Sequence, residues 1–319
     1  MWSRAFIKRC LPPPLFLGGP YCDGEQRLNN PEISPFGGSA THIRSLAVEP
    51  LRSMYIAKCN YDPSRYFDGL QKIDLYECRN TGMRFWRPSS IAGDEDFYAS
   101  LSRLWPNYYK TDRWEYEGAR KAIGKNPSMV LEVGCGRGYF LKSLETTVQE
   151  AAGLELNRKA IHEKVTTFPV YPVTIHEYAK TRTVKCNCVF SFQVLEHVAD
   201  PMTFLTELAH LVCSKGKLII SAPNYEFPLH ASLGDAFDLP PHHLNHFTPS
   251  VFKRIADVMG FKLISIATQK TVEPRFKFRV SSDHTKAQQF LRVFINKLAN
   301  RVSSQVHAGH TILVVFEVP

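Results

Sequence analysis

One run of residues in this chain has the types and spacing to hold a small ligand against the backbone. Residues 130–138 read Val-Leu-Glu-Val-Gly-Cys-Gly-Arg-Gly. The apolar start predicts a buried strand. The glycines predict a tight turn into a helix, because glycine adopts backbone conformations that other residues avoid. The N-terminus of the following helix favours polar or anionic ligand groups, so the run predicts a ligand site at this turn.

Glu155 ends the next predicted strand and is placed to accept hydrogen bonds from a ribose diol. The spacing of the glycines narrows the choice of ligand. A dinucleotide fingerprint needs a third glycine at the position that Tyr139 occupies here. The pattern is instead E-x-G-x-G-x-G, which begins at Glu132, and it argues against a dehydrogenase.

A second cluster, Pro-Pro-His-His-Leu-Asn-His at residues 240–246, follows a predicted strand at the edge where open α/β sheets bind ligands. Histidine can accept a proton near neutral pH. In a helical turn His243 and His246 would share a face, so we predict that one of them is a general base and that His242 is mainly structural. Such a cluster can also bind a divalent ion, but no companion acidic pair is obvious, and we predict no metal.

After Pro127, strands and helices alternate, which predicts a parallel sheet with crossover helices. The predicted strands are 129–133, 151–156, 170–173, 188–192, 217–222, 261–267 and 310–318. The predicted helices between them are 139–150, 159–165, 201–212 and 251–259.

The residues before Pro127 show a different sequence pattern. Residues 1–53 are rich in proline and glycine without a regular period, and we expect a loose N-terminal extension. Residues 54–123 predict a small cap with a hairpin at 73–86 and an aromatic-rich, helical stretch at 92–123. The catalytic domain would then span 124–319, with a helical insertion at 269–305.

The glycine run, Gly153-Leu154-Glu155-Leu156-Asn157, the segment 190–198 and the strand 216–220 stand in an order that resembles class I S-adenosylmethionine-dependent methyltransferases. The resemblance implies a Rossmann-like, three-layer α/β fold with a mostly parallel seven-stranded sheet and an antiparallel last strand. It also implies S-adenosyl-L-methionine as the cofactor.

The resemblance assigns roles to individual residues. The glycine turn would wrap the methionine part of the cofactor, and Glu132 would hold its amino group. Glu155 would accept from the ribose hydroxyls, Leu156 would pack on the adenine, and Ile175 and His176 are weaker candidates to flank it. The full set of implied cofactor-binding residues is Glu132, Gly134, Cys135, Gly136, Gly138, Glu155, Leu156, Phe192 and Gln193.

The flanks are similar to a narrower group, the small-molecule and sugar methyltransferases that carry a cysteine-containing module ahead of the catalytic domain. Here Thr81 stands where the second cysteine of the C-x-x-C-G hairpin would be, which leaves Cys59 and Cys78. Structural zinc needs four ligands, so we expect that this metal has been lost.

Composition limits the partners. The net charge of +9 comes from 1–58 and 269–301, while the rest of the chain is neutral, so no nucleic acid is expected. A helix at 286–302 with a basic face allows weak contact with a membrane surface or an anionic substrate. The few cysteines favour a cytoplasmic protein.

We expect methyl transfer to a small-molecule, sugar or glycan-type acceptor. A non-catalytic cofactor-binding scaffold and, less favoured, a nucleic-acid or protein methyltransferase stay open as alternatives.

Overall fold

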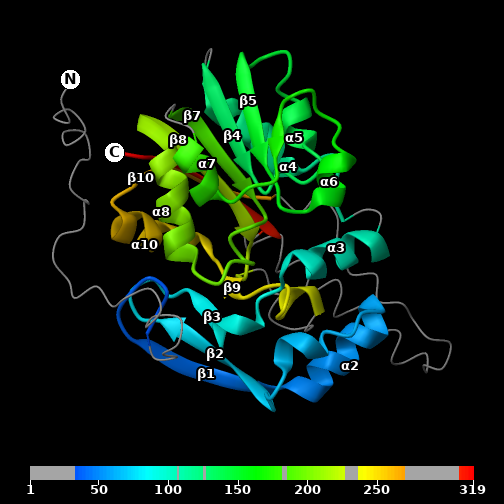
Figure 1. Ribbon diagram of the computed structural model, residues 1–319. Helices are drawn as coiled ribbons and strands as arrows, with labels where there is room; N and C mark the ends of the chain where they lie inside the picture. Colours follow the sequence, from blue (N-terminus) through cyan, green and yellow to red (C-terminus); the bar gives the residue numbers. More distant parts are fainter. Residues whose placement is uncertain (1–32, 106–107, 125–126, 182–184, 227–235, 270–308) are drawn as a thin grey trace, which may run out of the picture.

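The computed structural model describes residues 33–105, 108–124, 127–181, 185–226, 236–269 and 309–319. Its larger sheet has seven strands in the order β10-β11-β8-β7-β4-β5-β6 (Figure 1). These strands are β4 (Met129–Val133), β5 (Glu150–Leu154), β6 (Val170–Tyr171), β7 (Cys186–Phe192), β8 (Val212–Pro223), β10 (Lys262–Thr268) and β11 (Thr311–Glu317).

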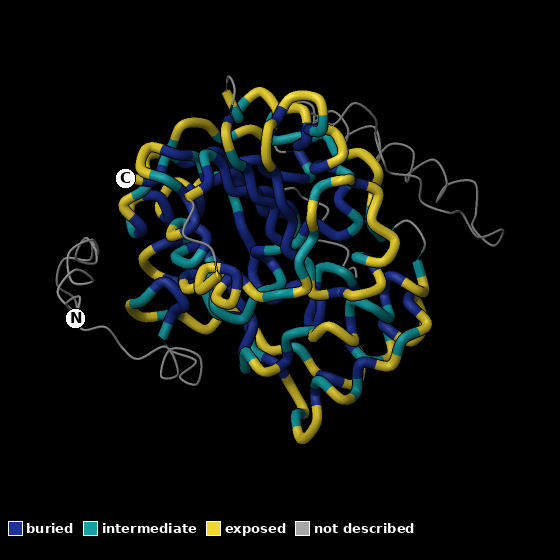
Figure 2. The backbone as a smooth tube through the Cα atoms, turned by 45° about the horizontal axis from the view of Figure 1, so that its top comes forward, coloured by how far each residue is buried: buried dark blue, intermediate teal, exposed yellow. Residues whose placement is uncertain are grey.

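Helices cover both faces of this sheet. One face packs on α4 (Trp114–Ile123) and α5 (Tyr139–Lys142). The other face packs on α7 (Ile175–Thr181), α8 (Pro201–Leu211) and α10 (Pro249–Met259). A short helix, α6 (Arg158–His162), follows β5. Figure 2 shows the central strands buried on both faces, as a sheet between two helical layers requires.

The predicted fold class is confirmed. Strand β11 pairs antiparallel with both β8 and β10, whereas β4, β5, β6, β7 and β8 pair in parallel. The prediction that the last strand lies antiparallel inside the sheet is therefore correct. Strand β4 has the predicted bounds, because its apolar residues and the following glycine mark both ends.

A smaller, four-stranded sheet has the order β1-β2-β3-β9. Its strands are β1 (Ala40–Ala47), β2 (Lys72–Cys78), β3 (Arg84–Arg87) and β9 (Asn245–His246). The helices α2 (Val48–Cys59) and α3 (Glu95–Leu104), with three 3₁₀ turns at Ser64–Phe67, Ser89–Ile91 and Ala236–Asp238, complete this region.

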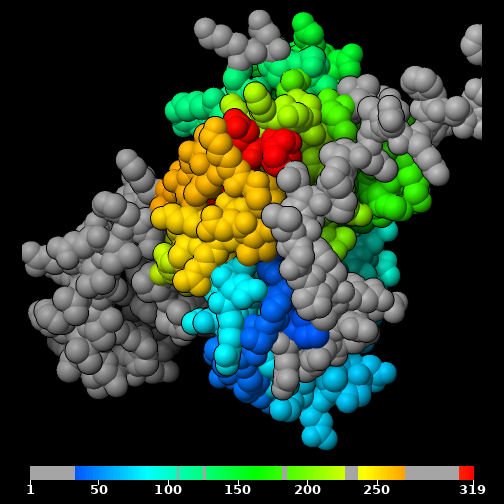
Figure 3. Space-filling model, turned by 90° about the vertical axis from the view of Figure 1, so that its left-hand side faces the viewer, coloured from blue at the N-terminus to red at the C-terminus, as the bar shows by residue number. Residues whose placement is uncertain are grey.

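The two faces of the small sheet belong to different cores. Ile73, Leu75 and Trp86 pack with α2 and α3, whereas Cys78 and Phe85 join the core beneath α10. In Figure 3 the yellow and orange surface of residues 236–269 lies against the cyan surface of β2 and β3. Because successive side chains of a strand point to opposite faces, one face of the small sheet packs on α2 and α3, and the other face packs on the core of the large sheet.

The expectation of a loose extension up to residue 53 is wrong for its last part, since β1 and the start of α2 lie there. Strand β1 pairs with β2 from Ala40↔Cys78 to Ala47↔Lys72. Its side chains are mostly exposed, so backbone hydrogen bonds to β2 hold the strand in place. Its sequence shows no alternation of apolar and polar residues from which the strand could be predicted.

The predicted helix 139–150 is shorter than expected, because α5 ends at Lys142 and turns follow. The Ser143 hydroxyl donates to the Phe140 carbonyl, which is typical of a helix end. The stretch 92–123 is helical, as predicted, but it forms two helices, α3 and α4. The sequence missed α7.

The predicted insertion 269–305 and the basic helix 286–302 lie, apart from Gln269, outside the described residues. The same holds for residues 1–32. Among the residues that the structure describes, no helix is long and apolar enough to cross a membrane.

The last strand offers a test of the fold. Phe316 is fully buried between α10 and the sheet, and we expect Phe316→Ala to lower the free energy of unfolding by about 3–5 kcal/mol. Ile264, on the neighbouring strand β10, is 44% exposed, so Ile264→Ala should cost about 1 kcal/mol or less. Chemical denaturation of both variants measures the difference. Equal losses would contradict the position of β11 inside the sheet.

Candidate functional site

A cavity of about 950 Å³ opens at the carboxyl ends of β4, β5 and β7, where open α/β sheets bind ligands. The glycine turn and Glu155 line one part of it. Helix α3 and residues 236–243 line another part, which therefore belongs to the small-sheet side. The volume falls at the upper end of the range typical of ligand pockets.

The glycine turn has a conformation that requires glycine. Gly134, Gly136 and Gly138 have φ angles of 74°, 54° and 75°, in the left-handed region. A Cβ atom on Gly136 would lie 2.5 Å from the Tyr109 ring, and one on Gly134 would lie 2.5 Å from Val194. The turn is thus closed tightly by side chains from other elements.

The carboxylate of Glu155 holds this turn in place. Its Oε2 accepts from the Gly136 N–H at 2.8 Å, and its Oε1 accepts from the Asn157 N–H at 2.8 Å. Burial raises the pKa of Glu155, while these N–H donors oppose that effect. Each oxygen keeps a further lone pair for hydroxyl donors, so the group fits the predicted ribose contact.

Glu132 presents a buried carboxylate oxygen beneath the turn. The side chain is 3% exposed, and its Oε2 has no hydrogen-bond partner among the described residues. A second cavity of about 30 Å³ adjoins it and is also lined by Arg113. Burial raises the pKa of Glu132 well above its usual range. An ammonium group would supply the missing donor, which fits the amino group of the expected cofactor.

The structure brings most of the predicted cofactor residues together. Gly134, Glu155, Leu156, Phe192 and Gln193 line the large cavity, and Glu132, Cys135 and Gly136 line the small one.

The remaining predicted residues are placed less directly. Gly138 lines neither cavity and stands at the start of α5. Ile175 lines the large cavity, whereas His176 does not. Cys135 packs under Gly153, and burial raises the pKa of its thiol, as expected of an inert small residue.

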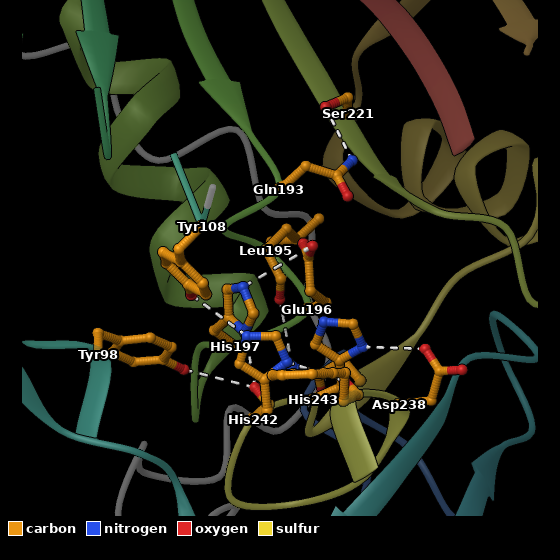
Figure 4. Close-up of polar contacts among 12 residues, drawn as sticks. Tyr98, Tyr108, Gln193, Leu195, Glu196, His197, Ser221, Asp238, His242 and His243 are labelled. Carbon is orange, nitrogen blue, oxygen red and sulfur yellow. Dashed lines mark hydrogen bonds and ion pairs between the residues drawn. The ribbon is translucent and has the colours of Figure 1, made fainter. Parts of the chain in front are cut away.

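Gln193 stands between the two parts of the large cavity. Its φ is 56°, and its Nε2 donates to the Ser221 hydroxyl at 3.1 Å. Ser221 donates in turn to the buried Glu115 at 3.3 Å. This chain of hydrogen bonds fixes the Gln193 side chain beside the cavity (Figure 4).

Three imidazoles converge at the other end of the large cavity, which we call the histidine end: His197, His242 and His243 (Figure 4). The rings of His242 and His243 stack at 4.4 Å, and the ring of His197 lies 4.6 Å and 5.0 Å from theirs. Burial lowers the pKa of His197 to about 3 and that of His242 well below its usual value. Both rings are therefore neutral near pH 7.

The structure places the three histidines of residues 240–246 differently from the helical turn that we expected. His243 lines the cavity, but His242 lines it too, and His246 does not. His246 lies in β9, pairs with Arg84 and stacks on Tyr225 at 3.7 Å. Pairing of β9 with β3 makes this segment extended, so residues three apart face opposite ways and no helical turn forms.

Four residues that the sequence left without a role belong to the site: Tyr108, Arg113, Glu196 and His197. The Tyr108 hydroxyl donates to His242 Nε2 at 3.2 Å, because His242 Nδ1–H donates to the Phe237 carbonyl. Glu196 is 1% exposed, and burial raises its pKa to about 8. The Leu195-Glu196-His197 motif was visible in the sequence, but its side chains acquire a role only when residues 236–243 fold over them.

The strand order, the glycine turn and the acidic side chain after β5 define a nucleotide-cofactor-binding α/β domain of the methyltransferase type. Residues 109–266 match a family described as a methyltransferase domain.

Two curated relatives are also described as methyltransferases. The chain is 24% identical over 147 residues to a probable S-adenosylmethionine-dependent methyltransferase of Mycolicibacterium smegmatis, covering 46% of this chain and 55% of that protein. It is 29% identical over 160 residues to a ubiquinone biosynthesis O-methyltransferase of Proteus mirabilis, covering 48% and 60%.

A solved S-adenosylmethionine-dependent methyltransferase of Archaeoglobus fulgidus aligns at 20% identity and a TM-score of 0.45, over 70% of this chain and 95% of that one. The chain covers less than two thirds of the length of the two curated relatives. The family match and the curated relatives identify residues 109–266 as a methyltransferase domain of the S-adenosylmethionine-dependent type.

Substitution of a glycine in the turn should change the affinity for the cofactor. Gly136→Ala would push a methyl group into Tyr109, so we expect it to weaken binding of S-adenosylhomocysteine at least about tenfold, equivalent to about 1.4 kcal/mol. Calorimetric titration measures the affinity.

Gly69→Ala is the matched control. Gly69 also has a positive φ, 72°, but open space surrounds its Cβ position. The two variants share the backbone strain of about 1–2 kcal/mol, and only Gly136→Ala should lose affinity. Equal affinities for both variants would contradict the assigned cofactor site.

Proposed function

We propose that this chain transfers a methyl group from S-adenosylmethionine to a small-molecule acceptor bound at the histidine end of the large cavity. One observation carries the proposal: a single cavity joins the glycine turn and Glu155 to three convergent imidazoles. Cofactor and acceptor can therefore meet inside one cavity. Alignment of the two reactants is the main contribution that such an enzyme makes.

At the cofactor end, each residue would bind a different part of S-adenosylmethionine. Glu155 would accept from the ribose hydroxyls, and Leu156, 49% exposed on the cavity wall, would cover the adenine. Glu132 Oε2, which has no hydrogen-bond partner among the described residues, would accept from the amino group of the cofactor. Arg113 lines both cavities and would pair with the carboxylate of the cofactor. When bound, S-adenosylmethionine supplies a methyl group that an attacking heteroatom can take directly.

At the histidine end, aromatic side chains set the size and the character of the acceptor. Trp105, Tyr108 and Phe237 form apolar walls, and Trp105 and Phe237 contact each other at a centroid distance of 3.8 Å. The residues that cover this end come from the small-sheet region, so a flat apolar or sugar-sized molecule fits better than a nucleic-acid strand. We propose a small acceptor with a nucleophilic oxygen or nitrogen, and sugars and glycan units stay within this class.

The acceptor must lose a proton as its heteroatom attacks. Neutral imidazoles can take such a proton, and burial keeps His197 and His242 at this end neutral. Of the two predicted bases, His243 lies on the cavity wall and His246 lies outside it. We therefore propose a role in acceptor activation for His243 alone.

Activity is tested with S-adenosylmethionine and a panel of phenols, amines and sugars, by measuring release of S-adenosylhomocysteine. We expect acceptor-dependent release. A protein that binds S-adenosylhomocysteine but releases none with any acceptor would instead be the non-catalytic scaffold that the sequence left open.

Once an acceptor is found, His243→Ala should lower kcat about 10²–10⁴-fold and leave the affinity for S-adenosylhomocysteine unchanged. His210→Ala, on the exposed side of α8, is the matched control and should change neither quantity. Unchanged turnover in His243→Ala would contradict the role of this residue.

A further inference from the structure

We propose that His197, His242 and His243 bind a divalent transition-metal ion of the zinc type at the histidine end of the cavity. One ring nitrogen of each residue lies within 4.8 Å of those of the other two. The three residues come from two loops, after β7 and after the 3₁₀ turn at Ala236–Asp238, so the fold creates this juxtaposition (Figure 4).

Hydrogen bonds orient two of the rings for coordination. A carbonyl oxygen can only accept, so His197 Nδ1–H donates to the His242 carbonyl at 2.6 Å, and His242 Nδ1–H donates to the Phe237 carbonyl at 2.8 Å. Both rings are neutral, so their lone pairs are on Nε2. That of His242 accepts from the Tyr108 hydroxyl at 3.2 Å, a contact that a bound ion would replace. Metal-binding histidines are typically oriented in this way, with the second nitrogen donating to an oxygen.

The third ring has an equivalent arrangement. His243 Nδ1 lies 3.1 Å from the Tyr225 hydroxyl and 3.6 Å from Asp238 Oδ1. The Tyr225 hydroxyl itself donates to the Asp238 backbone carbonyl at 3.3 Å, so its oxygen is the acceptor toward His243. His243 Nδ1–H therefore donates to the Tyr225 hydroxyl, as the Nδ1–H groups of the other two rings donate to carbonyl oxygens.

Glu196 is an independent observation that points to a cation at this place. Its carboxylate is 1% exposed, and neither oxygen has a hydrogen-bond partner among the described residues. Oε1 lies 3.8 Å from His197 Nε2, and the residue lines the cavity. A buried carboxylate without a donor is costly, and a cation held by the three imidazoles would remove that cost. The sequence offered no acidic companion for these histidines, and the fold supplies one.

The donor set selects the type of ion. Three imidazoles suit zinc and its neighbours in the first transition row better than Mg²⁺ or Ca²⁺, which prefer oxygen. Zinc–nitrogen bonds of about 2.0–2.1 Å place tetrahedral ligands about 3.4 Å apart, so ring nitrogens that lie up to 4.8 Å apart need to close by at most about 1.4 Å. Side-chain rotation alone can supply a movement of this size.

The role of the ion, unlike its binding, rests on the proposed function. An acceptor hydroxyl that coordinates the ion loses its proton to solvent more readily, because a bound divalent ion lowers the pKa of a coordinated oxygen. The oxygen–methyl bond then forms as the sulfur–methyl bond breaks, and S-adenosylhomocysteine leaves. In the metal-bound protein, His243 would act as a ligand.

The test uses tag-free protein that has been stripped with a chelator and titrated with Co²⁺ and Zn²⁺. We expect one equivalent of Co²⁺ to give the visible absorption of a tetrahedral nitrogen and oxygen site, which Zn²⁺ abolishes. His197→Ala and His242→Ala should each weaken Zn²⁺ binding by at least about tenfold, and Glu196→Gln by about 10–100-fold. His210→Ala and His162→Ala, both exposed, are controls that should bind as the wild type does.

Retained binding of S-adenosylhomocysteine shows that each variant is folded. Absence of Co²⁺ binding, a thiolate charge-transfer band, or affinity unchanged in the His197→Ala and His242→Ala variants would overturn the site. Bound metal together with full turnover of the stripped enzyme would overturn only its role. Bound metal without turnover on any acceptor would overturn the proposed function and leave the site standing.

Discussion

The architecture of the site depends on a few backbone hydrogen bonds that hold residues 244–246 between the two sheets. The Glu196 carbonyl accepts from the N–H groups of Leu244 and Asn245 at 2.8 Å and 3.0 Å. The Leu244 carbonyl accepts from the Trp86 N–H at 2.9 Å. The loop after β7, the histidine loop and β3 are thereby joined, and the imidazoles of residues 242 and 243 come to lie over His197. Without this connection, the small sheet would not cover the cavity.

The cavity that results holds several buried titratable groups that cost stability. Glu132 and Glu196 have raised pKa values because both are buried, and the imidazoles of His197 and His242 are kept neutral for the same reason. Perturbed groups of this kind gather where a ligand is to supply the missing partners. At one end the partner would be the amino group of the cofactor, and at the other end an acceptor or a cation. The same low-dielectric enclosure strengthens every polar contact that a bound ligand makes.

Sequence reasoning predicted what local chemistry dictates. The strand before Gly134, the glycine turn and Glu155 lie within a single β-turn-α-β unit, so their spacing alone was informative. The antiparallel last strand followed from a family pattern. What failed was non-local: β1 is held by backbone pairing and shows no apolar period, and β9 is extended because β3 pairs with it, which turns His246 out of the cavity. Glu196 and His197 acquire a role only through contacts with residues more than forty positions away in the chain.

We propose that cofactor and acceptor share one cavity between the glycine turn and the histidine end. A crystal structure of the complex with S-adenosylhomocysteine would show whether they do. We expect the ribose hydroxyls on Glu155, the amino group on Glu132, and the sulfur atom beside Gln193, facing His197, His242 and His243. A sulfur atom that faces away from the three histidines, or a nucleoside bound away from Glu155, would contradict it.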